Sequence, residues 1–136
     1  MSQENVEIVR RSNECRSRGD LAGALVAVHP DVEWLDIREP VLAPEARVGA
    51  ASLRSALEQW LAALDGFTTE VEGLIDEGDF VFVTSRWLGK CKGSGLSVDV
   101  HRAEVYEFAD GKIMRLTLGC PSTPMGEILK AVGLAE

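Results

Sequence analysis

The fold is decided by FTTEVEGLID (residues 67–76) and by the three strand-like runs that follow it closely. These runs are FVFVTSRWLG (80–89), LSVDVHRAEVYEF (96–108) and KIMRLTLG (112–119). Turn-forming residues separate them, namely EGD at 77–79, GKCKGSG at 89–95 and ADG at 109–111. Because no helical segment intervenes, we expect antiparallel hairpins joined as a meander.

The first half of the chain predicts helices over residues 3–18 and 21–28, a strand over 31–37, and a third helix from 51 or 52 to Gly66. A last helix is expected over 125–131. In the third helix, apolar residues recur at helical spacing, which predicts packing on the sheet through Leu57, Trp60 and Leu64. This order excludes a doubly wound sheet. It favours an α+β fold in which a curved antiparallel sheet wraps the third helix and leaves a cavity.

Composition limits the function. A length of 136 residues fits one domain spanning 1–136, and a net charge of −8 makes nucleic acid an unfavourable partner. Three cysteines without a CxxC motif and two distant histidines, His29 and His101, predict neither a disulfide framework nor a metal site. No apolar run is long enough to span a membrane, and the polar N-terminus is unlike a secretion signal, so we expect a cytoplasmic protein.

Several segments, in this order, resemble the SnoaL-like polyketide cyclases of the nuclear transport factor 2-like (cystatin-like) superfamily. The segments are GDLAGALVAVHPDVEW (19–34), the helix entry at 49–60, EGDFVFVTSRWLGKCKGSG (77–95), AEVYEFADGKIMRL (103–116) and EILKAVGL (127–134). The resemblance implies a cone-shaped α+β fold, commonly a homodimer, with a deep pocket for a small molecule. It leaves the reaction open, because relatives include cyclases, isomerases, hydrolases, dehydratases and non-catalytic domains.

The resemblance also implies which strand faces line the pocket. In the first strand it places Trp34 and Asp36 inward, and Asp36 is then similar to the catalytic base of ketosteroid isomerase-like relatives. A carboxylate beside an aromatic wall loses hydration, which raises its pKa toward a range useful for proton abstraction. The alternative is that Asp36 is a solvated residue at the end of the strand.

In the strand over 98–108, Arg102, Glu104 and Tyr106 share one face. The resemblance implies that this face points inward, so that Arg102 and Glu104 form a charged pair beside Tyr106. A one-residue slip of register would instead put His101 inside and leave Arg102 and Glu104 in water. This alternative stays open on sequence alone.

Further pocket residues are expected on the next strand and on the third helix. Ser85 and Trp87 lie on the face of strand 80–89 that the family pattern turns inward, and Trp60 serves equally well as core or pocket wall. On the opposite face of the sheet, we expect an apolar patch suited to a partner subunit, formed by Phe82, Thr84, Leu88, Ala103 and Val105.

The resulting hypothesis is an acid–base enzyme, cyclase- or isomerase-like, that needs no cofactor or metal and acts on a small apolar or polyketide-like molecule. Asp36 takes the proton, Arg102 with Tyr106 or Ser85 stabilises the enolate, and Glu104 orients Arg102 or acts as the second acid. The alternative is a non-catalytic ligand-binding or dimerisation module. Gly119-Cys120-Pro121 favours this alternative, because family members often carry a tyrosine and an acid there.

Overall fold

The computed structural model describes residues 2–36 and 47–118, apart from the side chains of residues 2, 35, 36 and 60. The elements are α1 (Ser2–Ser17), α2 (Leu21–Ala24), β1 (Val28–Asp36), β2 (Arg47–Val48), α3 (Ala50–Ala63), β3 (Leu64–Asp76), β4 (Phe80–Cys91), β5 (Ser97–Ala109) and β6 (Lys112–Leu118). The helix expected over 125–131 and most of the expected 38–49 loop lie outside the described residues.

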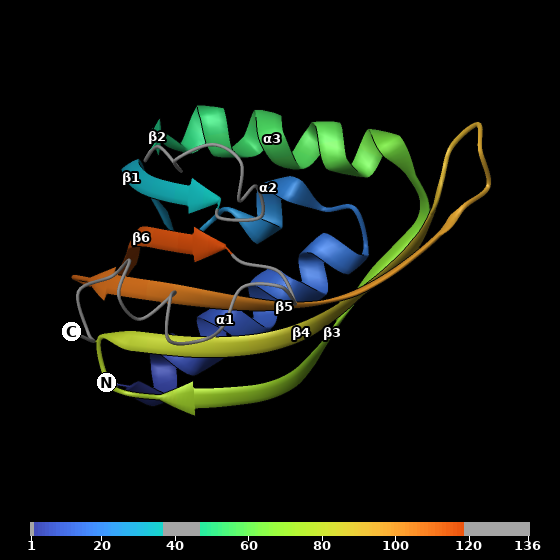
Figure 1. The fold of residues 1–136 in the computed structure, drawn as a ribbon. Coiled ribbons are helices and arrows are strands. Elements are labelled where there is room, and N and C mark those ends of the chain that lie inside the picture. The colour runs from blue at the N-terminus through green and yellow to red at the C-terminus, as the bar shows by residue number, and fades with distance from the viewer. Residues whose placement is uncertain (1, 37–46, 119–136) are drawn as a thin grey trace.

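The strands form one sheet in the order β2-β1-β6-β5-β4-β3, which runs from top to bottom in Figure 1. β3 to β6 are the predicted antiparallel meander. β1, however, pairs in parallel with β6, with Trp34 opposite Leu116 and Asp36 opposite Leu118. The sheet is therefore mixed rather than antiparallel throughout, because a long connection between β1 and β6 frees their relative direction from the constraint of a hairpin.

Local backbone chemistry explains the turns and the curvature. The predicted turn between β5 and β6 consists of Asp110 and Gly111, with φ of 53° and 75°. Positive φ at both positions is the requirement of a type I′ turn, and Asp-Gly is a preferred pair for it. β3 shifts register against β4 between Asp65 and Thr68 and again between Val71 and Gly73. Such bulges bend a strand and increase its twist, which curves the sheet.

Two predicted helices end early because strand pairing takes over their last residues. α2 stops at Ala24 rather than at residue 28, and Val28 instead opens β1 opposite Ile113 of β6. α3 stops at Ala63, and Leu64 begins β3 opposite Cys91. In both cases the hydrogen-bond ladder of the sheet outweighs a local helical preference, which is weak by comparison.

The helices cover one face of the sheet, with α1 and α2 behind it in Figure 1 and α3 along its upper edge. α1 packs mainly on β3 and α2, whereas α3 packs mainly on β1. The contact of α3 with the core agrees in part with the prediction. Leu57 is partly buried and packs against the core, as expected, whereas Leu53 is the fully buried residue among the described side chains of α3. Leu64 is buried in a core cluster but belongs to β3.

The outer face of the sheet also differs from the prediction. Phe82 and Val105 are already buried in the single chain, at 6% and 1% exposure. Phe80 stacks on Phe82 with ring centroids 6.4 Å apart, which accounts for part of this burial. Thr84 is exposed, and Leu88 and Ala103 are half-buried. The five residues therefore do not form the open apolar patch that was expected.

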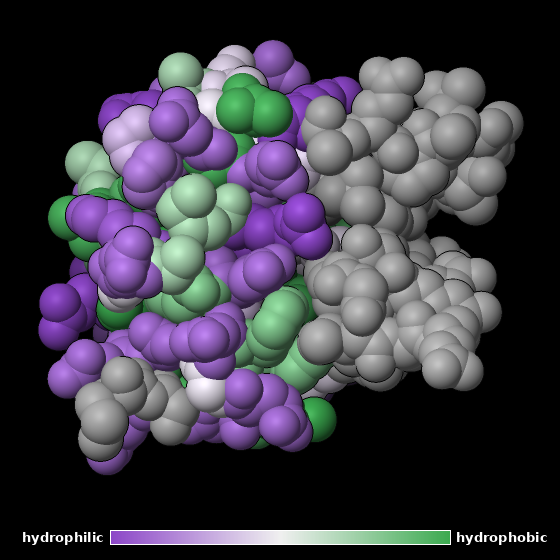
Figure 2. Space-filling view, turned by 90° about the vertical axis from the view of Figure 1, so that its left-hand side faces the viewer, coloured by the Kyte–Doolittle hydropathy of each residue, from purple (hydrophilic) through white to green (hydrophobic). Residues whose placement is uncertain are grey.

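The end of the molecule seen in Figure 2 is mostly hydrophilic among its coloured residues, with apolar side chains scattered between polar ones. Scattered apolar side chains of this kind are normal on a protein surface. Among the described residues, no helix is both long and apolar enough to cross a membrane.

Candidate functional site

Four polar side chains lie on the concave face of β4 and β5, where an apolar core would be expected. Ser85, Arg102, Glu104 and Tyr106 are all buried, at 3% exposure or less. Alternation along the strands puts them on this face, and Ser85 pairs directly with Arg102 across the ladder. His101 is exposed and lies 2.6 Å from the Glu72 carboxylate. The register with Arg102 and Glu104 inside is therefore confirmed, and the alternative with His101 inside is wrong.

Glu104 is the centre of this cluster and has no exposed surface. The Tyr106 hydroxyl donates to its Oε2 at 2.9 Å, and the Ser85 hydroxyl donates to its Oε1 at 3.2 Å. Nη2 of Arg16 lies 3.4 Å from Oε1 and 3.5 Å from Oε2. A buried carboxylate is tolerated when it is paired and hydrogen-bonded in this way, because burial without partners costs several kcal/mol.

Arg16 is the residue that the sequence analysis missed. It comes from α1 rather than from the sheet, is 5% exposed, and receives support from Asn13, whose Oδ1 accepts from Nη2 at 2.6 Å. Asn13 in turn donates to the Val9 carbonyl oxygen at 3.0 Å. Positions 9, 13 and 16 share one helical stripe, so the signal available in the sequence was a pair of polar residues on the stripe of the buried Val9.

The charges of the cluster fix its protonation. Burial acts to raise the pKa of Glu104, but the guanidiniums of Arg16 and Arg102 and the hydrogen bond from Tyr106 outweigh it and hold that pKa below its usual value. Burial and the neighbouring Glu104 carboxylate raise the pKa of Tyr106. At neutral pH the site therefore holds an ionised Glu104, a neutral Tyr106 and two guanidinium cations.

Trp87 forms the aromatic wall beneath the two guanidiniums. The guanidinium carbon of Arg102 lies 4.1 Å from a Trp87 ring centroid, and that of Arg16 lies 5.3 Å away. Both distances fall in the range of cation–π attraction. The indole Nε1 donates to Ser85 Oγ at 3.2 Å, and Phe67 packs edge-on against the ring. Ser85 and Trp87 thus support the charged groups from one side.

The remaining predicted site residues are Trp34, Asp36 and Trp60. Trp34 is buried in the core, where its indole donates to Ser52 Oγ at 2.9 Å, and Arg47 lies 5.1 Å above its ring. Asp36 is the last residue of β1 and Trp60 lies in α3, but their side chains are outside the described part of the structure.

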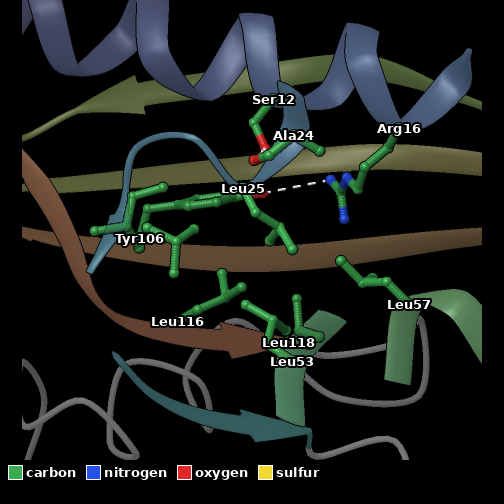
Figure 3. Close-up of a pocket in the computed structure, with 11 residues that line it drawn as sticks. Ser12, Arg16, Ala24, Leu25, Leu53, Leu57, Tyr106, Leu116 and Leu118 are labelled. Carbon is green, nitrogen blue, oxygen red and sulfur yellow. Dashed lines mark hydrogen bonds between the residues drawn. The ribbon is translucent and has the colours of Figure 1, made fainter. Parts of the chain in front are cut away.

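A narrow cavity of about 20 Å³ lies above Tyr106 and beside Arg16. Its lining is apolar except for Ser12, Arg16 and Tyr106 (Figure 3). The apolar lining residues are Ala24, Leu25, Val28, Leu53, Leu57, Ile113, Leu116 and Leu118. This volume holds about one water molecule. In Figure 3 the end of the Arg16 side chain points toward the space between Leu25 and Leu57. The cavity thus places a buried cation against an apolar enclosure.

Within residues 2–36 and 47–118, no three His, Cys, Asp or Glu side chains are grouped so that they could hold an ion.

Sequence comparison places the chain in a family. A model of the SnoaL-like domain matches residues 9–116. The chain belongs to the SnoaL-like domain family. The matched range contains every described residue of the cluster around Glu104, so the charged site lies within the SnoaL-like domain. A search of curated proteins finds no match.

Solved structures share the fold of this SnoaL-like domain. A suggested SnoaL-like polyketide cyclase from Jannaschia sp. CCS1 is 19% identical, with a TM-score of 0.78 over 93% of this chain and 90% of that one. TerC co-crystallised with polyporic acid is 22% identical, with a TM-score of 0.74 over 93% and 98%. An NTF2-like protein of unknown function from Burkholderia pseudomallei is 20% identical, with a TM-score of 0.74 over 96% and 98%. These likenesses confirm the predicted nuclear transport factor 2-like fold.

Proposed function

We propose that this SnoaL-like domain binds a small, largely apolar molecule and acts on it as a cofactor-independent acid–base enzyme of the cyclase or isomerase type. The observation that carries the proposal is the fully buried Glu104, held between Arg16, Ser85 and Tyr106 beside an apolar cavity. A buried ionic cluster stabilises a fold poorly compared with apolar packing, so its presence beside a cavity favours a role in ligand chemistry.

The chemistry assigns separate roles to the charged groups. Asp36 takes a proton from a carbon next to a carbonyl group of the ligand, and the electron pair of the broken C–H bond moves to the carbonyl oxygen. The Arg16 guanidinium, which lines the cavity, stabilises the resulting enolate oxygen; Arg102, which was expected in this role, does not line that cavity and lies against Trp87. Ser85 and Tyr106 both donate to Glu104, so they support the carboxylate rather than the enolate. Glu104 stays ionised and positions the guanidiniums.

Relatives of this fold support ligand binding. TerC, at 22% identity, was crystallised with polyporic acid, which is an organic molecule held by a domain of the same fold. We extend this to the present chain as a binding role for a small organic molecule. We also propose that the chain forms a homodimer, as family resemblance implies. Light scattering at micromolar concentration tests this directly, and a monomeric mass would rule it out.

The experiment for the enzymatic role separates binding from proton transfer. A thermal shift screen of cyclic ketones and diketones, each with a C–H bond next to a carbonyl group, identifies binders, because a ligand of the native state raises the melting temperature. Each binder is then incubated with the protein in D₂O, and exchange of protons next to its carbonyl group is followed by ¹H NMR. We expect exchange with the natural protein and its loss in Asp36→Asn, with binding retained.

Two results decide between the alternatives. Exchange that persists unchanged in Asp36→Asn would overturn the assignment of the base. Binding without exchange for every ligand would favour the non-catalytic binding module, whose requirement is an apolar wall alone.

A further inference from the structure

Two small hollows lie on either side of the same pair of side chains. The first is the cavity of about 20 Å³ beside Tyr106, and the second lies over Trp87 and has no room for a water molecule. The lining of the second is Arg16, Leu21, Leu57, Leu61, Phe67 and Trp87. Arg16 and Leu57 are the two residues common to both linings. The side chains of Arg16 and Leu57 therefore form a partition that separates two neighbouring hollows.

The two halves of this partition are held very differently. Arg16 is fixed by Asn13 at 2.6 Å and by Glu104 and Tyr106 at 3.4 Å. Leu57 is partly buried on α3 and can form no hydrogen bond through its side chain. In Figure 3 it points from α3 toward the end of Arg16. Leu57 is therefore the half that can change rotamer and join the hollows.

The polar groups of the lining restrict what a ligand can present. The Ser12 hydroxyl donates to the Ala24 carbonyl oxygen at 2.9 Å, and the Tyr106 hydroxyl donates to Glu104 at 2.9 Å. Arg16 is left as the N–H donor of the first cavity, and its Nε is buried without a hydrogen-bond partner among the described residues. A ligand group placed there must accept a hydrogen bond from a cation, as a carboxylate, an enolate or a carbonyl oxygen does.

We propose that Leu57 divides a single binding chamber, and that a ligand joins the two hollows by displacing Leu57. The ligand is a small apolar molecule with one acidic or carbonyl oxygen turned toward Arg16. Its apolar body extends from Leu116 and Leu118 toward Trp87. This inference rests on the proposed function only for the location of the ligand site, since it requires binding and no chemical step.

The test uses three variants that remove the same atoms from different walls. Leu57→Ala removes the partition, whereas Leu53→Ala enlarges only the first hollow and Leu61→Ala only the second. The probes are benzoate and toluene, which differ in the charged oxygen group, and affinity is measured by NMR titration at pH 7. We expect Leu57→Ala to bind benzoate at least tenfold more tightly than the natural protein, because the ligand no longer displaces a side chain.

The controls make the result specific. Leu53→Ala and Leu61→Ala should stay within about threefold of the natural protein, since each leaves the partition in place. Benzoate should bind Leu57→Ala at least tenfold more tightly than toluene does, and Arg16→Gln should remove this preference. If Leu57→Ala does not fold, Leu57→Val removes fewer atoms from the same position. It should also bind benzoate more tightly than the natural protein, by a smaller factor.

Equal gains in all three alanine variants would mean general loosening of the core and would overturn the partition. Toluene binding as tight as benzoate binding would overturn the ligand class, because Arg16 would not select an oxygen. These outcomes are independent of proton exchange in D₂O. Failure of the enzymatic proposal therefore leaves a distinct signature from failure of the chamber.

Discussion

Replacement of Glu104 by Gln tests whether the buried cluster is held together by charge. The amide has nearly the size of the carboxylate, so no cavity forms, but the negative charge facing Arg16 and Arg102 is lost. Gln also presents N–H donors to Tyr106 and Ser85, which both donate to Glu104. Removing one partner of a buried ion pair costs about 3–5 kcal/mol, and we expect a loss in this range at pH 7.

The assay is urea unfolding, in which the midpoint should fall while the slope m stays constant. The matched control is Glu33→Gln, because Glu33 forms an ion pair with Arg115 at 3.2 Å on the surface, with half of the Glu33 side chain exposed. Surface pairs contribute about 0–1 kcal/mol, so this variant should be nearly as stable as the natural protein. A cost for Glu104→Gln no larger than that of the control would refute the argument.

The pH dependence provides a second, independent measure of the same interaction. The pKa of Glu104 is lower in the folded state than in the unfolded chain, where a glutamate titrates at about 4.3. Its stabilising contribution is therefore fully present above pH ~4.3 and is lost as the pH falls through the folded-state pKa. The difference in unfolding free energy between the natural protein and Glu104→Gln should narrow on acidification below pH ~4. A difference that stays constant from pH 7 to pH 3 would contradict the lowered pKa.

Three further variants test the core, the tyrosine and the turn. Leu53→Ala should cost about 2–5 kcal/mol by chemical unfolding and Leu57→Ala clearly less, because Leu53 is 1% exposed and Leu57 is only partly buried; equal costs would contradict this packing. Tyr106→Phe should remove a loss of stability that the natural protein shows above pH ~10, because the stabilisation from a raised tyrosine pKa is fully present below the unfolded-state pKa and is lost as the pH rises from there through the folded-state pKa. Parallel alkaline unfolding curves would argue against that shift. Gly111→Ala should cost about 1–2 kcal/mol through its φ of 75°, and no change in the thermal midpoint would exclude strain there.

Strand faces could be predicted because a period of two leaves two choices for each strand, and the family resemblance selected between them for the strand over 98–108. Once Tyr106 and Phe108 pointed inward, Arg102 and Glu104 had to follow, and the same rule placed Ser85 beside Trp87. The parallel pairing of β1 with β6 could not be predicted, since it joins segments far apart in the sequence without a turn between them.

Arg16 shows why the site was harder to predict than the fold. On a helix, a polar residue at the edge of an apolar stripe normally lies in water, and α1 carries several such residues. Its burial depends on Glu104, which lies 88 positions further along the chain and provides the opposite charge. Local patterns describe one element at a time, whereas this ion pair exists only when α1 has docked on the sheet.

The parallel pairing of β1 with β6 also determines when the site can form during synthesis. The lining of the small cavity includes Ser12 of α1 and Leu118 at the end of β6. A chain leaving the ribosome therefore cannot enclose Arg16 and Glu104 until β6 has emerged, although α1 and β1 were made first. Contacts between such remote segments slow folding, because the chain loses loop entropy before it gains the contact. We expect nascent chains that end before β6 to expose the charged interior and to be recognised by chaperones and proteases as unfinished.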